Sequence, residues 1–298
     1  MKIENKIVQE LMESDNPFPI LFEYLLEEIW TPKPGIKEYY AQEQEMNKFE
    51  RFLSNVYGEI YSELLPRYCM DKDKNLDMEH SIILLDSLSL REAILLKKDL
   101  QEEGFDVNLS FSYSSLPSDT KFYKEKISYE EIKRKNKTKK IQDPDSISLE
   151  GDEDIIWSDF PDAWLENISA GRTKLNKIED MFNNCKNLLF NILDQMENTP
   201  AVTITSDHGY VRSEAAYSFK TNESDQKELR QVMGGSRYKP IENANGEECV
   251  KAGYLLNFNG YYLAKERHTW TIGGKYEIFQ HGGVSLLECL IPRLEVEG

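Results

Sequence analysis

The chain has 298 residues, of which 40% are hydrophobic and 11% aromatic, so it can bury a sizeable core in one elaborated domain or two. A formal net charge of -17 repels a phosphate backbone at long range and excludes non-specific binding of duplex DNA as a main function. The four cysteines show no Cys-x-x-Cys spacing, no apolar run approaches ~18 residues, and the N-terminus lacks a basic start followed by an apolar core. We therefore expect a cytoplasmic protein without a zinc knuckle, a disulfide framework or contact with a membrane.

The first part of the chain has helical periodicity and no strand signal. Apolar residues recur every three to four positions in the segments 21–30 and 49–64. The charged and polar stretch 71–77 then changes the composition of the chain. We predict an N-terminal helical region over 1–75 and a second domain over 76–298.

Short apolar runs alternate with helical patterns after residue 76, as in an α/β sheet. The run 81–85 is typical of a buried parallel strand, and the helical pattern that follows ends at Gly104. This order implies right-handed crossovers and a mostly parallel sheet flanked by helices, with the strand at 201–205 near its centre. The predicted elements are strands at 81–85, 106–113, 154–157 and 201–205, and helices at 90–103 and 175–196.

Two stretches interrupt this alternation. The segment 133–140 holds six cations in eight residues, which is typical of a solvated loop but also fits a positively charged flap that attracts an anionic substrate. The segment 211–251 is polar, and 254–263 then alternates like a hairpin with Asn259-Gly260 at its turn. We predict a small cap insertion over about 211–265.

Candidate metal ligands follow two of the predicted strands. Asp207 and His208 come just after the strand at 201–205, and Asp86 comes directly after the strand at 81–85. The carboxyl ends of parallel neighbours meet at one edge of a sheet, so these side chains can converge there on a metal ion. Asp86 can equally cap the helix that follows it, and the residues alone leave both readings open.

Three further sites carry groups that suit metal or phosphoryl chemistry. Asp162 and Glu166 share one face of a helix that begins near Pro161, where they can reach one ion or form an ordinary solvated face. His281 is followed by two glycines, which allow close approach of the backbone. Thr120 precedes a predicted helix, either as a plain cap or as a reactive hydroxyl.

Several of these segments together resemble a known family, the PglZ domain of the alkaline phosphatase superfamily. The resemblance spans residues 80 to 298 in family order, and the N-terminal helical region has no such support. The last of the segments is the most specific. The segments are Leu84-Leu-Asp-Ser-Leu-Ser-Leu-Arg-Glu92, Leu116-Pro-Ser-Asp-Thr120, Thr205-Ser-Asp-His-Gly-Tyr210, Ser236-Arg-Tyr-Lys239 and Phe279-Gln-His-Gly-Gly-Val-Ser-Leu-Leu-Glu-Cys-Leu-Ile-Pro292.

The resemblance implies an alkaline phosphatase-like sheet with two divalent metal ions at its carboxyl edge. These ions are commonly zinc, with manganese as the alternative, and a Ser or Thr nucleophile lies between them. In this chain Asp86, Asp207 and His208 match the ligands of one metal, and Thr120 matches the nucleophile in contact with it. The ligands matched at the other metal are Asp162 and His281.

This chain departs from the family pattern at the second metal. The pattern has a second histidine four residues after the Asp, and Glu166 stands at that position here. A carboxylate can bind zinc or manganese, but it adds negative charge, lowers the Lewis acidity of the ion and shifts preference toward harder ions. Arg237 and Lys239 are expected to hold the phosphate oxygens or a neighbouring nucleotide.

The leading hypothesis is a metal-dependent phosphodiesterase or phosphatase acting on a nucleotide or single-stranded nucleic-acid phosphoester. The family includes components of BREX-type anti-phage defence, so defence-system protein partners are expected as well. The competing hypothesis, motivated by Glu166 and the acidic composition, is a non-catalytic or weakly active interaction subunit with the same fold. An isomerase or mutase of the superfamily would need a larger second domain than the insertions provide.

Overall fold

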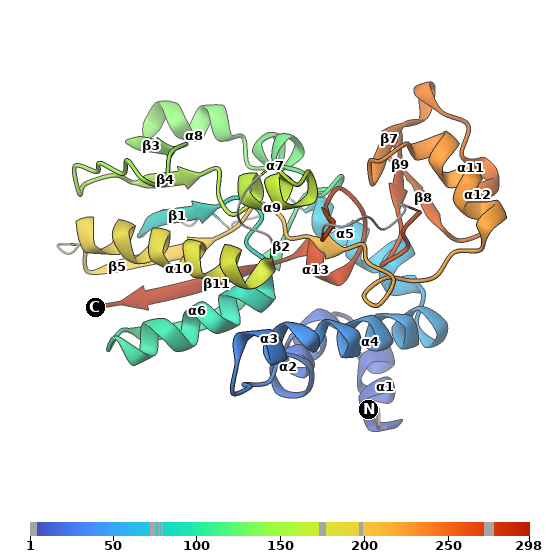
Figure 1. The fold of residues 1–298 in the computed structure, drawn as a ribbon, viewed down its shortest axis with the longest axis horizontal. Helices are drawn as coiled ribbons and strands as arrows, with labels where there is room; N and C mark the ends of the chain where they lie inside the picture. The colour runs from blue at the N-terminus through green and yellow to red at the C-terminus, as the bar shows by residue number, and fades with distance from the viewer. Residues whose placement is uncertain are drawn as a thin grey trace.

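The fold is a central six-stranded sheet flanked by helices, with a small separate sheet at one end (Figure 1). The predicted α/β class with an N-terminal helical region and a small cap insertion is confirmed. No helix in the described part of the chain is long and apolar enough to cross a membrane. The computed structural model describes residues 5–71, 76, 78, 80–172, 177–196, 199–270 and 277–298.

The central sheet is mostly parallel and has the strand order β2-β11-β5-β1-β4-β3. β1 pairs in parallel with β4 and β5, and β3 with β4, whereas β11 runs antiparallel to both β2 and β5. The four predicted strands are confirmed, as is the central position of β5, but the sequence analysis missed β3 and β11. The strands are β1 (Ser81–Leu85), β2 (Asp106–Tyr113), β3 (Thr138–Ile141), β4 (Ile155–Ser158), β5 (Ala201–Thr205) and β11 (Leu290–Glu297).

Side-chain alternation along the strands gives the sheet two buried faces. Ile83 and Leu85 of β1 join the main core with α6 and α10, whereas Leu84 and Trp157 pack on the opposite face with α7 and α8. The predicted long helix is α10, although Leu175 of its expected stripe lies outside the described residues. The helices are α6 (Leu90–Glu102), α7 (Thr120–Lys126), α8 (Tyr129–Lys135), α9 (Asp162–Ser169) and α10 (Ile178–Gln195).

The N-terminal helices pack against the sheet and share its main hydrophobic core. Trp30 and Phe49 are fully buried in the same cluster of side chains as Ile204 of β5. The boundary expected near residue 76 stays a prediction. The helical elements are α1 (Asn5–Glu13), α2 (Phe18–Tyr24), the π-helical turn η1 (Leu25–Ile29), α3 (Ile36–Ala41), α4 (Glu43–Val56), the π-helical turn η2 (Ile60–Leu64) and α5 (Leu65–Met70).

The cap is built on a three-stranded antiparallel sheet of order β7-β9-β8. The predicted hairpin is confirmed as β8 and β9, and Asn259 and Gly260 at its turn both have positive φ, at 47° and 82°. The cap elements are α11 (Glu223–Met233), β7 (Tyr238–Pro240), the 3-10 turn η3 (Ile241–Asn243), α12 (Glu247–Lys251), β8 (Leu255–Phe258) and β9 (Tyr261–Ala264). Two short strands, β6 (Val211–Arg212) and β10 (Phe279–Gln280), pair with each other in antiparallel fashion, and the short helix α13 (Leu286–Cys289) directly precedes β11.

The cations of the basic segment 133–140 are exposed, as in the solvated reading, but the segment is not one continuous loop. Its first residues complete α8 and its last residues lie in the edge strand β3. Lys137 pairs with Glu150 at 2.7 Å, and Lys140 pairs with Asp159 at 2.9 Å. These cations therefore compensate acidic side chains of the neighbouring loops at the edge of the sheet.

The central position of β5 predicts a large loss of stability on truncation of its buried side chains. Ile204→Ala is expected to lower the free energy of unfolding by about 2–5 kcal/mol, because Ile204 is fully buried in the main core. Urea denaturation measures this loss. The control Met12→Ala, at a side chain that is 60% exposed, is expected to change stability by less than about 0.5 kcal/mol. Equal effects of the two substitutions would contradict the packing described above.

Candidate metal centre

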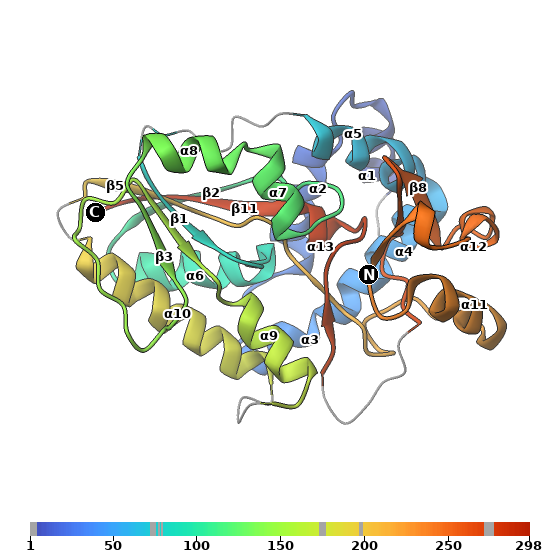
Figure 2. The ribbon, with the colours of Figure 1, turned by 90° about the horizontal axis from the view of Figure 1, so that it is seen from above.

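Two neighbouring strands deliver candidate ligands to the same edge of the sheet. Asp86 follows β1 directly, and Asp207 and His208 follow β5 after one residue. Leu84 pairs with Thr205 in parallel register, so both strands end at the same level. Viewed from above, this end of the sheet points toward α13 and the cap (Figure 2). The predicted carboxyl-edge site is therefore where these side chains meet.

The first cluster of ligand atoms belongs to Asp86, Asp207 and His208. Each residue offers one ligand atom, and these atoms all lie within 4.8 Å of one another. The hydroxyl of Thr120 lies in the same place, 2.6 Å from Asp207 Oδ2, 3.2 Å from both oxygens of Asp86 and 3.3 Å from His208 Nε2. The structure thus brings together the four residues that were assigned to one metal and its nucleophile.

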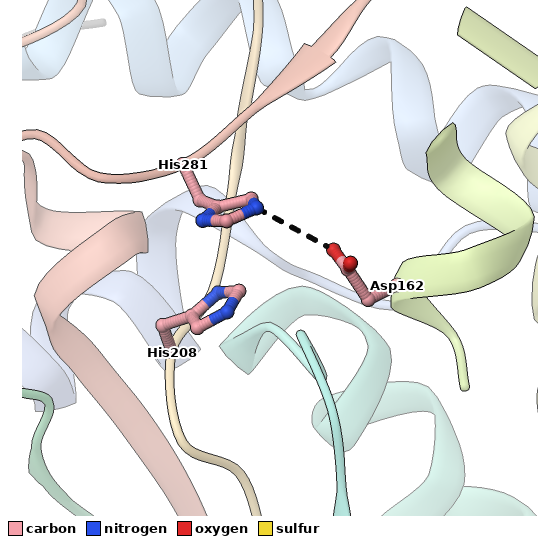
Figure 3. Close-up of side chains that lie close together, drawn as sticks. All are labelled: Asp162, His208 and His281. Carbon is pink, nitrogen blue, oxygen red and sulfur yellow. Dashed lines mark ion pairs between the residues drawn. The ribbon is translucent and has the colours of Figure 1, made fainter. Parts of the chain in front are cut away.

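The second cluster joins Asp162, at the start of α9, with His281 and again His208 (Figure 3). His281 Nε2 lies 3.7 Å from Asp162 Oδ1. The rings of His208 and His281 are stacked, with their centroids 4.1 Å apart and their planes at 19°. His208 is therefore shared by both clusters, whereas the sequence analysis assigned it to one metal alone.

The turn that carries His208 depends on the glycine that follows it. A Cβ atom at Gly209 would lie 2.0 Å from the carbonyl oxygen of Leu287, so any larger residue would displace this turn or α13. Gly209 also donates its N–H to the carbonyl of Glu288 at 3.1 Å. On the other side, the N–H of Ser87 donates to Asp207 Oδ1 at 3.2 Å. Close packing of three backbone segments therefore orients the ligands.

Negative charge exceeds positive charge in the buried first cluster. Burial alone lowers the pKa of His208, but Asp207, Asp86 and Asp162 outweigh burial and raise this pKa to about 9. Burial, followed by the charge of Asp207, raises the pKa of Asp86 well above its ordinary value. His208 and Asp86 thus hold a proton more strongly than usual, because the buried negative charge around them favours an added positive charge.

A divalent cation fits this donor set. Imidazole nitrogen and carboxylate oxygen are the ligands that zinc and manganese accept in proteins. Three carboxylates stand against two imidazoles in the two clusters together, and Asp86, Asp207 and His208 are nearly or fully buried. Asp86, Asp207 and His208 would hold one ion, and Asp162 and His281 would contribute to a second.

Glu166 lies apart from both clusters. It is exposed on α9, one turn after Asp162, and it belongs to neither group of ligand atoms within 4.8 Å. It does line the same cavity as Asp162 and His281. The proposed role of Glu166 as a metal ligand therefore stays a prediction, and binding through this residue would need a different rotamer of its long side chain.

A cavity of about 460 Å³ opens beside the second cluster, between α9 and the cap. Its volume lies within the range of small-molecule binding sites. Carboxylates, aromatic rings and neutral polar groups all contribute to its wall. The lining residues are Asp119, Asp162, Leu165, Glu166, Tyr210, Gly235, Ser236, Arg237, Tyr238, Ile278, Phe279, Gln280 and His281.

The protein-family model described as the BREX system PglZ alkaline phosphatase-like domain matches residues 127–296, which is more than half of the chain. The chain belongs to the PglZ family. The match includes Asp162, Asp207, His208 and His281 of the two clusters, and it begins after Asp86 and Thr120. The resemblance inferred from short segments is thereby confirmed.

Solved structures similar to this PglZ protein include two of phosphonoacetate hydrolase from Sinorhizobium meliloti 1021, one in complex with phosphonoformate and one with phosphonoacetate. Each is 13% identical, has a TM-score of 0.24, and is aligned over 49% of this chain. The chain spans 46% of the length of those hydrolases. No curated protein matches the chain significantly.

Arg237 lines the cavity at the junction between the cap and α13. Its side chain is buried, and its Nε and Nη2 atoms donate to Glu288 at 2.7 and 2.9 Å. It also donates to the carbonyl oxygens of Glu266 and His268. An arginine with these partners joins the cap to α13, and its expected role in holding phosphate oxygens or a nucleotide stays a prediction.

Lys239 is not among the described residues that line the cavity. It pairs with Tyr262 across β7 and β9, and Tyr262 belongs to the small core of the cap. Because side chains alternate along a strand, Lys239 and Tyr238 stand on opposite faces of the cap sheet. Tyr238 lines the cavity, so Lys239 faces away from it.

Two residues that support the candidate metal ligands, Asp119 and Glu288, were not predicted from the sequence. Asp119 caps α7 by accepting from Lys121 N, and its Oδ2 lies 3.8 Å from His281 Nδ1. Glu288 accepts the N–H of Gly283 at 2.8 Å and anchors the loop after His281. The spacing of Ser285 and Glu288 is that of a capping box, which could have marked this glutamate as buried and bonded.

The metal affinity of the PglZ domain is expected to rise with pH up to about 9. Below the raised pKa of His208, about 9, a metal ion must displace the proton of the imidazole. Affinity should then rise about tenfold per pH unit for each proton released. Titration with Zn²⁺ against a chromophoric chelator, between about pH 6.5 and 8.5, measures this slope. The slope should decrease in His208→Asn, and a pH-independent affinity of the wild type would contradict the prediction.

Proposed function

We propose that this PglZ protein is a metal-dependent phosphoric ester hydrolase that acts on phosphodiesters of nucleotide type. The observation that carries the proposal is the position of the Thr120 hydroxyl. It lies among Asp86, Asp207 and His208, and the second cluster adjoins it through the stacked ring of His281. A nucleophile flanked by two ligand sets is the arrangement that in-line phosphoryl transfer requires.

Thr120 is the proposed nucleophile. Its Oγ1 lies 2.6 Å from Asp207 Oδ2, so this carboxylate accepts the hydrogen bond of the hydroxyl and orients its lone pairs. Asp119 holds the first turn of α7, which fixes the backbone that carries Thr120. Two divalent ions, zinc or manganese, would supply positive charge to the phosphoryl oxygens and lower the pKa of the hydroxyl.

The charges around the cavity favour a diester over a monoester. Arg237 is neutralised by Glu288, Lys239 faces away, and no other Lys or Arg lies among the described lining residues. Asp119 and Glu166 add negative charge to the wall. A monoester dianion would be repelled there, whereas a diester carries one negative charge and a second substituent that needs no cation.

The wall of the cavity also suits a nucleotide. Tyr238 and Phe279 offer aromatic surface, and Gln280 and Ser236 offer neutral hydrogen-bonding groups that can recognise the edge of a base. The net charge of -17 favours short or single-stranded substrates over duplex DNA. The BREX description of the matching family supports a role in anti-phage defence alongside protein partners.

Removal of the nucleophile is expected to abolish hydrolysis. Thr120→Ala should lower kcat for bis-para-nitrophenyl phosphate, with zinc or manganese added, at least on the order of a thousandfold. Thr120→Ser, which keeps a hydroxyl, should retain measurable activity. The matched control Lys239→Ala should behave as the wild type, because this side chain faces away from the cavity.

The same assay separates the proposal from its alternatives. Faster hydrolysis of para-nitrophenyl phosphate than of the diester would contradict the diester preference. Full activity of Thr120→Ala would overturn the role of this residue. A wild-type protein that binds metal but hydrolyses neither ester would favour the non-catalytic interaction subunit, for which the position of Glu166 outside both clusters is the supporting observation.

A further inference from the structure

Two carboxylates of the N-terminal helical region are buried beneath the metal centre. Glu43 and Glu50 lie seven residues apart on one face of α4, and both are completely inaccessible to solvent. A buried charge is tolerated only when it is paired. Glu43 forms ion pairs with Arg91 and Arg267, and Glu50 pairs with Arg267 at 3.3 Å. These four side chains form one buried ionic network.

The network reaches the segment that carries His208. Arg91 Nη2 donates to the carbonyl oxygen of Tyr210 at 2.9 Å, and its guanidinium lies 4.1 Å from the centroid of the Tyr210 ring. Tyr210 is two residues after His208 and follows Gly209, where close packing admits no side chain. Glu43, by holding Arg91, therefore sets the position of the backbone immediately after a shared metal ligand.

The network also reaches the segment that carries His281. Glu50 Oε1 accepts the N–H of Leu286 at 2.9 Å, at the first residue of α13. From the same short helix, Glu288 accepts the N–H of Gly283 at 2.8 Å. The loop from His281 to Leu286 thus donates hydrogen bonds to two buried carboxylates, Glu288 of α13 and Glu50 of α4.

Helix α3 adds a second connection through hydroxyl groups. Tyr39 Oη donates to the carbonyl of Arg91 at 2.8 Å, and Tyr40 Oη donates to Glu92 Oε1 at 2.9 Å. The same Glu92 oxygen accepts the hydroxyl of Tyr210 at 2.9 Å. Through Arg91 and Glu92, the N-terminal helices are therefore linked to both the backbone and the side chain of Tyr210.

We propose that Glu43 is a positioning residue of the metal centre, acting through Arg91 on the His208–Tyr210 turn. In this proposal the N-terminal helical region helps to hold the candidate metal ligands in place. The inference rests on the proposed metal centre. The physical reason for a positioning role is that the imidazoles of His208 and His281, stacked 4.1 Å apart, keep this geometry only while the two segments that carry them keep their relative position.

The test measures metal affinity without any substrate. Glu43→Gln keeps the size of the side chain but removes the charge that pairs with Arg91 and Arg267. Zn²⁺ titration against a chromophoric chelator should show an affinity about tenfold weaker than that of the wild type, as for other residues that orient metal ligands. Circular dichroism and thermal unfolding establish that the variant is folded, so that loss of affinity reports on the site.

Two further variants complete the design. Glu45→Gln, on the same helix, alters a partly exposed side chain that pairs with Lys48, and it should bind Zn²⁺ as the wild type does. Tyr40→Phe removes only the hydroxyl bonded to Glu92. It should fold normally and bind Zn²⁺ less tightly than Glu45→Gln.

The outcomes are distinct. Wild-type affinity in folded Glu43→Gln would overturn the positioning role and leave the metal centre intact. If Glu43→Gln does not fold, Tyr40→Phe decides, and an unchanged affinity in that variant overturns the proposal. A wild-type chain that binds neither Zn²⁺ nor Mn²⁺ would instead overturn the metal centre itself, and the positioning role with it.

Discussion

The parallel pairing of β1 with β5 is the constraint on which the rest of the site depends. Their register places Asp86 and Asp207 at the same level, so two carboxylates enter one buried space. Their mutual repulsion is relieved only by positive charge, which explains why His208 holds a proton strongly and why a divalent cation fits. Asp162 and His281 then form a second candidate site around the same imidazole.

Much of the fold could be predicted because the sheet is buried on both faces. Strands such as 81–85 and 201–205 are continuous apolar runs, and their lengths are read directly from the sequence. β3 was missed because it is short and two of its four residues are exposed lysines, of which Lys140 pairs with Asp159. β11 contains Pro292 and alternates with charged residues, so no local pattern shows that it lies between β2 and β5.

Some residues of the candidate site could be predicted from the sequence, and others could not. The structure brings Asp86, Thr120, Asp207 and His208 together because they lie at strand and helix ends, where topology determines position. The contacts of Arg237 could not be predicted, because the sequence shows a cation but not its buried partner, Glu288, 51 residues further along the chain. The ionic network of α4 was missed for the same reason, since long-range pairing of buried charges has no local signature.

The position of β11 has a consequence for how the protein is made. β2 is joined to the other strands of the central sheet through β11, which follows all of them in sequence. During synthesis from the N-terminus, β2 and β5 therefore lack their shared neighbour until residues 290–297 have emerged. His281 arrives at the same late stage. A partly synthesised chain accordingly lacks both a continuous sheet and the full set of candidate ligands, so completion of the sheet and of the candidate metal centre coincide in time.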